Sequence, residues 1–343
     1  MRAVVAHAAK DLRIETLPVA DLGPHDIRVR IQTGGICGSD LHYYNHGGFG
    51  AIRLKEPMIL GHEIAGTVEA VGRSARRIQA GDRVAISPSR PCNHCRFCLE
   101  GQQNQCLDMR FYGSAMRFPH VQGAFREVLV CEEVQAHVVA QGVSMGEAAM
   151  AEPLAVCLHA VRRAGSLLGK KVLITGSGPI GTLAVLAARR AGAAEIVITD
   201  VADGALDFAR KVGADRTINV ATTPDGLVPY TADKGTFDIL FEASGNEAAL
   251  RGALDAVRPG AILVQLGLGG DIKLPINTIV AKELQLRGTF RFHEEFGIAV
   301  DMIGKGLIDV KPLISATLPF QEANRAFELA LDRSQSMKVQ LSF

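Results

Sequence analysis

The chain contains no tryptophan, and its aromatic residues make up only 5% of 343 positions. It also lacks an excess of either charge, since 37 lysines and arginines face 36 aspartates and glutamates. This balance gives no basic stripe for nucleic acid and no acidic tail. The N-terminus lacks a hydrophobic run long enough for a signal peptide or membrane span, because Lys10 and Asp11 interrupt it. We therefore expect a cytoplasmic protein with a small-molecule partner, and neither nucleic acid nor membrane as a partner.

The length predicts about two domains. Seven cysteines are an odd number, and four of them follow the spacing C-x2-C-x2-C-x7-C, namely Cys92, Cys95, Cys98 and Cys106. Four thiolates at this spacing can close a tetrahedron around zinc and leave no position for a substrate. The alternative is a cluster of free or disulfide-bonded cysteines, which would leave reactive thiols in an exposed loop. We predict a structural zinc lobe at about 88–110.

A second set of metal ligands is predicted from Cys37, His62 and Glu63. A thiolate, an imidazole and a carboxylate form a mixed set typical of a catalytic zinc that keeps one position open. Nearby glycines are expected where backbone must approach a bound group, and they are Gly34, Gly35, Gly38 and Gly61. Whether Glu63 binds directly or through water stays open at this point.

Three polar residues follow the thiolate closely. Ser39 carries a hydroxyl that can relay a proton, and His42 offers a proton exit. Asp40 can orient the imidazole of His62 from behind. This order predicts catalytic roles for all three.

The second half of the chain carries a dinucleotide-binding pattern. An apolar strand over 171–175 precedes the loop GSGPIG, a helical run follows, and Asp200 ends the next strand. The glycines let the backbone approach a pyrophosphate, and the acid can accept the ribose hydroxyls of NAD. A 2′-phosphate would meet that negative charge, so NAD is favoured over NADP. The expected loop contacts are Gly176, Gly178, Pro179, Ile180 and Gly181.

Further apolar strands over 237–242, 261–266 and 284–287 alternate with helical stretches, which predicts a doubly wound parallel sheet. Ligands bind at the carboxyl ends of strands in such sheets. The cofactor contacts expected there are Leu266, Gly267, Phe290 and Arg291. The first part of the chain shows period-two alternation instead, as in 26–32, and is expected to be β-rich.

The segment over 107–130 sets basic groups among aromatic ones, including Arg110 and His120. Such a mixture could hold an anionic group of a substrate. The alternative is a solvated loop whose aromatic rings lie in the core. The spacing does not decide between the two.

The segments GGICGSDLHYY and ILGHE, the cysteine cluster and the GSGPIG loop together resemble the zinc-dependent medium-chain dehydrogenase/reductase family, in its polyol branch. The resemblance covers nearly the whole chain. It implies an α/β protein with a β-rich GroES-like catalytic domain, 1–149 and 296–343, and an NAD-binding Rossmann domain, 150–295. It also implies two zinc ions per subunit and a homo-oligomer, either a dimer or a tetramer.

The resemblance further implies roles that spacing does not. Glu152, by spacing an ordinary charge at a helix start, would be a fourth zinc ligand or a partner of the zinc-bound water. Arg291 would contact substrate, and the tyrosine common after it is replaced here by Phe292. The full set of expected substrate contacts is Tyr43, Arg110, His120, Glu152 and Arg291.

The implied reaction moves hydride from a secondary alcohol to NAD, while the hydroxyl proton leaves through Ser39, a ribose hydroxyl and His42. Within the branch, the chain resembles enzymes that oxidise a sugar acid at C5, whose carboxylate would suit the basic residues. One alternative is a dehydrogenase of neutral polyols such as sorbitol or xylitol. A remote alternative is a zinc- and NAD-binding protein without turnover.

Overall fold

The computed structural model describes residues 1–343, and their packing separates two units. Unit 1 comprises Met1–Glu152, His293–Asp332 and Lys338–Phe343. Unit 2 comprises Pro153–Phe292 and Arg333–Met337. The short segment Arg333–Met337 therefore packs with unit 2, whereas the sequence places it in the first domain.

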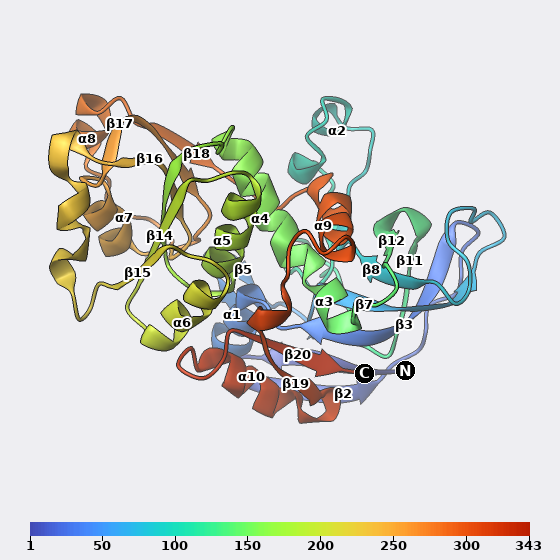
Figure 1. The fold of residues 1–343 in the computed structure, drawn as a ribbon. Helices are drawn as coiled ribbons and strands as arrows, with labels where there is room; N and C mark the ends of the chain where they lie inside the picture. Colours follow the sequence, from blue (N-terminus) through green and yellow to red (C-terminus); the bar gives the residue numbers. More distant parts are fainter. The chain divides into compact units, whose positions relative to one another are not determined.

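Unit 1 is built around a seven-stranded sheet in which β3 is the central strand (Figure 1). One edge of β3 (Asp26–Gly35) pairs with β7 (Glu63–Val71). Its other edge pairs first with β11 (Val128–Glu132) and then with β20 (Lys338–Ser342). Ile27, Val29 and Ile31 alternate toward a buried apolar core, as the period-two pattern predicts.

Strands β8, β12 and β19 complete this sheet, and the remaining elements of unit 1 are short strands and helices around it. The strands are β1 (Arg2–Ala8), β2 (Asp11–Thr16), β4 (Gly48–Phe49), β5 (Ile52–Arg53), β6 (Met58–Ile59), β8 (Arg83–Ile86), β9 (Ser89–Arg90), β10 (Arg110–Phe111), β12 (Ala136–Val138) and β19 (Ile314–Pro319). The α-helices are α1 (Gly38–His46), α2 (Arg96–Leu99), α3 (Met145–Ala149), α9 (Glu295–Gly304) and α10 (Ala323–Leu331). The 3-10 helices are η1 (Gln103–Gln105), η2 (Glu133–Gln135), η5 (Lys311–Leu313) and η6 (Phe320–Glu322).

Unit 2 is a parallel six-stranded sheet with the order β15-β14-β13-β16-β17-β18. The strands are β13 (Lys171–Thr175), β14 (Glu195–Asp200), β15 (Arg216–Asn219), β16 (Phe237–Glu242), β17 (Val257–Gln265) and β18 (Gln285–Gly288). Numbered from β13, this order is 3-2-1-4-5-6, which is the Rossmann order and reverses direction between β13 and β16. The predicted α/β fold class, a Rossmann domain beside a β-rich GroES-like domain, is confirmed.

Helices pack against this sheet, and α5, α6 and α7 contact its central strands (Figure 1). Helix α5 begins at Pro179, whose ring fixes a helical φ where no amide donor is needed. The α-helices are α4 (Ala151–Ala164), which starts two residues before unit 2, α5 (Pro179–Arg190), α6 (Asp203–Lys211), α7 (Glu247–Ala253) and α8 (Ile276–Ala281). The 3-10 helices are η3 (Pro224–Tyr230) and η4 (Ala232–Lys234). None of the helices combines the length and the apolar character that a membrane crossing requires.

Candidate metal and cofactor sites

Three candidate metal ligands converge in unit 1 where β3, α1 and β7 meet. Cys37 immediately precedes α1, His62 precedes β7, and Glu63 is the first residue of β7. Their sulfur, nitrogen and oxygen donors all lie within 4.8 Å of one another. Strand pairing explains part of this arrangement, because Gly35 at the end of β3 lies opposite Glu63.

The glycines near these ligands make room for protein atoms. A Cβ atom on Gly35 would lie 2.1 Å from Oε2 of Glu63. A Cβ atom on Gly61, whose φ is 89°, would lie 2.1 Å from the ring of Phe125. The sequence predicts that these glycines admit a bound group. At both positions the structure instead shows that they admit a carboxylate and an aromatic ring of the chain itself.

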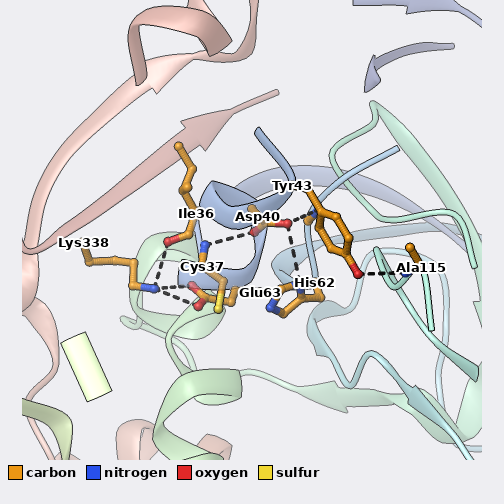
Figure 2. Close-up of polar contacts among 9 residues, drawn as sticks. Ile36, Cys37, Asp40, Tyr43, His62, Glu63, Ala115 and Lys338 are labelled. Carbon is orange, nitrogen blue, oxygen red and sulfur yellow. Dashed lines mark hydrogen bonds and ion pairs between the residues drawn. The ribbon is translucent and has the colours of Figure 1, made fainter. Parts of the chain in front are cut away.

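Asp40 links the two segments that carry the ligands (Figure 2). One carboxylate oxygen accepts the Cys37 amide at 3.0 Å, and the other accepts the Gly61 amide at 3.0 Å. The predicted partner, Nδ1 of His62, lies 3.8 Å from Oδ1 of Asp40. That distance exceeds hydrogen-bond length, and Nδ1 is buried without a hydrogen-bond partner. Asp40 therefore holds the ligand-bearing backbone and contributes only a charge contact to the imidazole.

Lys338 is a component of this group that the sequence does not predict. Its ammonium donates to both oxygens of Glu63, at 2.7 and 2.8 Å, and to the carbonyl of Ile36 at 3.2 Å (Figure 2). Both side chains of the ion pair are almost completely buried. Burial alone would lower the pKa of Lys338, but the charges of Glu63 and Cys37 raise it above its usual value.

The charges of this group favour a bound cation. Burial, followed by the charge of Glu63, raises the pKa of the Cys37 thiol to about 12. Burial likewise raises the pKa of Glu152 to about 8, with smaller upward contributions from Glu63 and Cys37. Burial also raises the pKa of Asp40. Four acidic groups thus crowd around the ammonium of Lys338 and one imidazole, and the donor set is the one that zinc binds.

The four cysteines of the second cluster also converge. Their sulfur atoms lie within 4.8 Å of one another, and the sulfurs of Cys95 and Cys98 are 3.6 Å apart. All seven cysteines of the chain are free thiols, so the disulfide alternative is not observed. Backbone amides, first that of Leu107, lower the pKa of Cys95 to about 6. This lobe has the closed four-sulfur set of a structural zinc site.

Two predicted substrate contacts have other roles in the structure. His120 is buried, and its Nε2 accepts the Lys55 amide at 2.8 Å while Nδ1 lies 2.7 Å from the Arg117 carbonyl. Both ring nitrogens are thus used within the chain, which contradicts a contact with substrate. Arg110 is exposed and its neighbour Phe111 is buried 5.4 Å from the ring of His62. Because successive side chains of a strand point to opposite faces, Arg110 points away from the ligand group.

The remaining predicted residues of unit 1 lie on α1. The hydroxyl of Tyr43 is buried and accepts the Ala115 amide at 2.9 Å (Figure 2). Ser39 is half-buried and His42 is exposed, 5.7 Å from the ring of Phe49. The increase in exposure from Ser39 to His42 suits a path for a proton from the half-buried serine hydroxyl to solvent.

The glycine-rich loop of unit 2 has the conformation of a phosphate-binding turn. Gly176 adopts φ 88°, and a Cβ atom on Gly181 would lie 1.8 Å from the Gly176 carbonyl oxygen. A Cβ atom on Gly178 would meet nothing within 4 Å, so the loop is open at that point. These features fit a pyrophosphate at the N-terminus of α5.

Asp200 organises the same loop. One oxygen accepts the Ser177 amide at 2.6 Å, and the other accepts the Val201 and Ala202 amides at 2.7 and 3.0 Å. The carboxylate is therefore fixed at the end of β14. Oδ2, which accepts a single amide, retains a lone pair for a ribose hydroxyl.

The other predicted cofactor residues follow β17 and β18. The amides of Leu266 and Gly267 donate to the Glu242 carbonyl at 2.8 and 2.9 Å. Arg291 has a positive φ of 56° and places its guanidinium 4.8 Å from the ring of Phe290. Phe292, which replaces the tyrosine common in the branch, is buried.

Known proteins match both units. Residues 23–141 match the alcohol dehydrogenase GroES-like domain, and residues 179–305 match the zinc-binding dehydrogenase domain. The L-idonate 5-dehydrogenase (NAD(P)(+)) of Escherichia coli is 44% identical over 92% of this chain and 91% of its own length. The chain belongs to the zinc-binding dehydrogenase family.

Other family members match along the entire chain. Sorbitol dehydrogenase of Bacillus subtilis is 36% identical over 99% of this dehydrogenase and 96% of its own length. The crystal structure of L-idonate 5-dehydrogenase from Escherichia coli matches with a TM-score of 0.94 and 42% identity, covering 100% and 98% of the two chains. An alcohol dehydrogenase from Escherichia coli solved with NADH matches with a TM-score of 0.90 and 28% identity, covering 100% and 99%.

Proposed function

We propose that this dehydrogenase oxidises L-idonate at C5 with NAD, giving 5-keto-D-gluconate, and that each subunit holds one catalytic and one structural zinc ion. The convergence of Cys37, His62 and Glu63 carries the proposal, together with similarity to L-idonate 5-dehydrogenase. The Cys92 cluster would hold the second, structural ion. Glu152 supports the first site, because it is buried beside the three donors.

The residues of unit 1 would divide the work between metal binding and proton movement. A zinc ion held there would supply Lewis-acid chemistry, which lowers the pKa of a bound water or alcohol toward neutral. Ser39 would accept the hydroxyl proton and pass it through a ribose hydroxyl to His42, which is exposed and would release it to solvent. The hydride from C5 would go to NAD, so the alcohol becomes a ketone.

Unit 2 supports NAD as the cofactor. Asp200 would accept the ribose hydroxyls, and its fixed charge would oppose a 2′-phosphate. Gly178 would let the backbone approach the pyrophosphate, whereas Gly176 and Gly181 allow the tight turn that places it there. Pro179 and Ile180 begin the helix behind this turn. Because the Escherichia coli relative is named for both NAD and NADP, the assay should compare the two cofactors.

Recognition of the substrate carboxylate is proposed for Arg291. Of the three basic candidates, His120 has both ring nitrogens engaged and Arg110 points away from the ligand group. An arginine is the side chain best suited to pair with a carboxylate. Tyr43 and Glu152 remain proposed contacts for the hydroxyl end of the substrate.

A homo-oligomer and a cytoplasmic location complete the proposal. Strand β18 is an edge of the parallel sheet and exposes Leu286, and the preceding helix α8 exposes Ile276 and Val280. An exposed apolar edge strand of this kind favours pairing with another copy. The free thiols of the chain suit a reducing compartment.

The test is the initial rate of NADH formation with L-idonate, sorbitol and xylitol, together with zinc analysis of the purified enzyme. We expect kcat/KM for L-idonate to exceed that for sorbitol by at least about tenfold, and Arg291→Gln to remove most of this difference while sorbitol oxidation changes less. Equal values for the two substrates in the wild type would contradict the sugar-acid assignment. Absence of NADH with every substrate would favour a protein without turnover.

A second candidate function is neutral-polyol oxidation, which the match to sorbitol dehydrogenase over 99% of the chain favours. In that case sorbitol or xylitol would be the better substrate, and Arg291→Gln would leave the preference unchanged.

A further inference from the structure

A buried carboxylate in unit 2 lies outside the predicted cofactor and metal residues. Glu242 ends β16 and is 1% exposed. Its Oε1 accepts the Ser244 amide at 2.9 Å, the Ser244 hydroxyl, and the Thr175 hydroxyl at 3.3 Å. Its Oε2 accepts Nε2 of Gln265 at 2.5 Å, and the Gly245 amide lies 3.0 and 3.1 Å from the two oxygens.

These bonds join three adjacent strands at their carboxyl ends. Thr175 ends β13, Glu242 ends β16 and Gln265 ends β17. Gln265 extends the network by donating to the Gly267 carbonyl at 2.9 Å, and its own carbonyl accepts the Thr289 amide at 3.2 Å. The side chains of Glu242 and Gln265 thus connect the carboxyl ends of β13, β16 and β17, and the main chain of Gln265 extends the connection to the residue after β18.

The loops that follow β16 and β17 are packed so closely at their glycines that no side chain would fit there. A Cβ atom on Gly267 would lie 2.1 Å from the Gly245 amide nitrogen, and one on Gly269 would lie 1.7 Å from the Gly245 carbonyl oxygen. Gly245 itself adopts φ 65°. The loops after β16 and β17 therefore touch backbone to backbone, and the carboxylate beneath them sets their spacing.

The donors to Glu242 are neutral, so no ion pair compensates this buried charge. Burying a carboxylate is costly unless hydrogen bonds satisfy it, and a neutral apolar residue would avoid the cost. The position of Glu242 in the sheet suggests a role in binding a dinucleotide. The sheet order reverses between β13 and β16, and dinucleotides bind outside the carboxyl ends of strands at such a point.

We propose that Glu242 is a positioning residue for the nicotinamide half of the cofactor. Rossmann sheets consist of two mononucleotide-binding halves, and β16, β17 and β18 form the half opposite the Gly176 loop and Asp200. By fixing the loops at 244–245 and 266–269, Glu242 preforms the backbone that receives this half. The inference rests on the proposed NAD binding.

The test compares Glu242→Gln with the wild-type holoenzyme. Glutamine keeps the size but turns one acceptor oxygen into an amide donor, which then opposes Gln265 or the Gly245 amide. We expect the Kd for NADH and the KM for NAD to rise at least tenfold. Inhibition by AMP, which occupies the other half alone, should change less than twofold.

Asp238→Asn is the matched control, because Asp238 lies on the same strand and accepts the Lys171 amide at the opposite end of the sheet. It should lower stability without changing the Kd for NADH. If Glu242→Gln does not fold, Gln265→Ala removes the bonds to Glu242 and Gly267 more gently and should raise the Kd for NADH three- to tenfold.

Wild-type protein that fails to bind NADH would contradict the proposed function, whereas the inference concerns only the difference between variants. An unchanged Kd for NADH in the folded variants would overturn it. A parallel loss of AMP inhibition would also overturn it, because that result indicates general unfolding at the carboxyl ends of the strands.

Discussion

The ammonium of Lys338 compensates the buried negative charge of Glu63 in unit 1. Removing one partner of a buried pair leaves an uncompensated charge and typically costs about 3–5 kcal/mol. We therefore expect Lys338→Met to destabilise the metal-free protein by that amount. Added zinc should stabilise the variant more than the wild type, because the metal then supplies the missing positive charge. Thermal unfolding with and without chelator measures both effects.

The double variant Glu63→Gln with Lys338→Met provides the control. It removes both charges and should recover much of the stability of the metal-free protein. A single Lys338→Met variant as stable as the wild type would show that the pair contributes nothing measurable.

Functional residues that lie close together in the sequence can be predicted from their spacing, whereas their partners from distant segments cannot. Cys37 and Ser39 belong to one short segment, and the four clustered cysteines to another, so their shared chemistry is visible in the spacing. Lys338 contacts Glu63 across 275 residues, and a lone lysine at the start of a strand gives no sign of that contact. His120 misleads for the opposite reason, since the backbone partners that occupy its ring are invisible in sequence.

At the scale of elements, Asp238 ties the start of β16 to its neighbours. It accepts the Lys171 amide at 2.9 Å and Nε of Arg258 at 2.8 Å. Burial acts to raise its pKa, but these hydrogen bonds lower it below the ordinary 3.8. A lowered pKa in the folded state stabilises the protein above the ordinary value, and this stability is lost as the pH falls through the folded-state pKa.

We expect Asp238→Asn to cost about 1–3 kcal/mol at neutral pH, since hydrogen bonds to a charged group are lost. The difference from the wild type should shrink as the pH falls below 3.8. Urea unfolding at a series of pH values measures it. A difference that stays constant into acid would contradict the assigned role of the charge.

The lobe that contains the four clustered cysteines should depend on its zinc ion for folding. Because metal-binding energy in a structural site is folding energy, Cys98→Ser should lose one of two zinc ions and lower the melting temperature strongly. Cys37→Ser should also lose one zinc ion, but it should abolish turnover with a smaller change in melting temperature. Cys131→Ala, a buried cysteine outside both clusters, should keep both ions. Two zinc ions in Cys98→Ser would refute the site.

Elements with a continuous pattern are predicted well because their burial is uniform. Strand β13 is buried from Val172 to its end and apolar over 172–174, and the glycine loop that follows it marks where it ends. Strand β15 is a poorer case, since Arg216–Asn219 lies at the sheet edge with little apolar character. The pairing of β3 with three other strands depends on register, which the alternation of side chains does not encode.

At the scale of the whole molecule, the C-terminal residues complete the first unit. Strand β20 pairs with the end of β3, next to the segment that carries Cys37. This return brings Lys338 to Glu63, so loss of the last strand would remove both a strand and a buried countercharge. The discontinuous course of unit 1 is thus coupled directly to the ligand group.

The edge strand β18 is the proposed contact surface between copies of the chain. Leu286 on this strand is 46% exposed, and Ile276 and Val280 on α8 are 58% and 69% exposed. A lysine on an edge strand discourages pairing with another chain, so Leu286→Lys should shift the proposed oligomer toward monomer in size-exclusion chromatography. Its melting temperature should then no longer rise with protein concentration. Val228→Lys, at a site in η3 that is 58% exposed, should leave the assembly intact. An unchanged elution volume for Leu286→Lys would place the interface elsewhere.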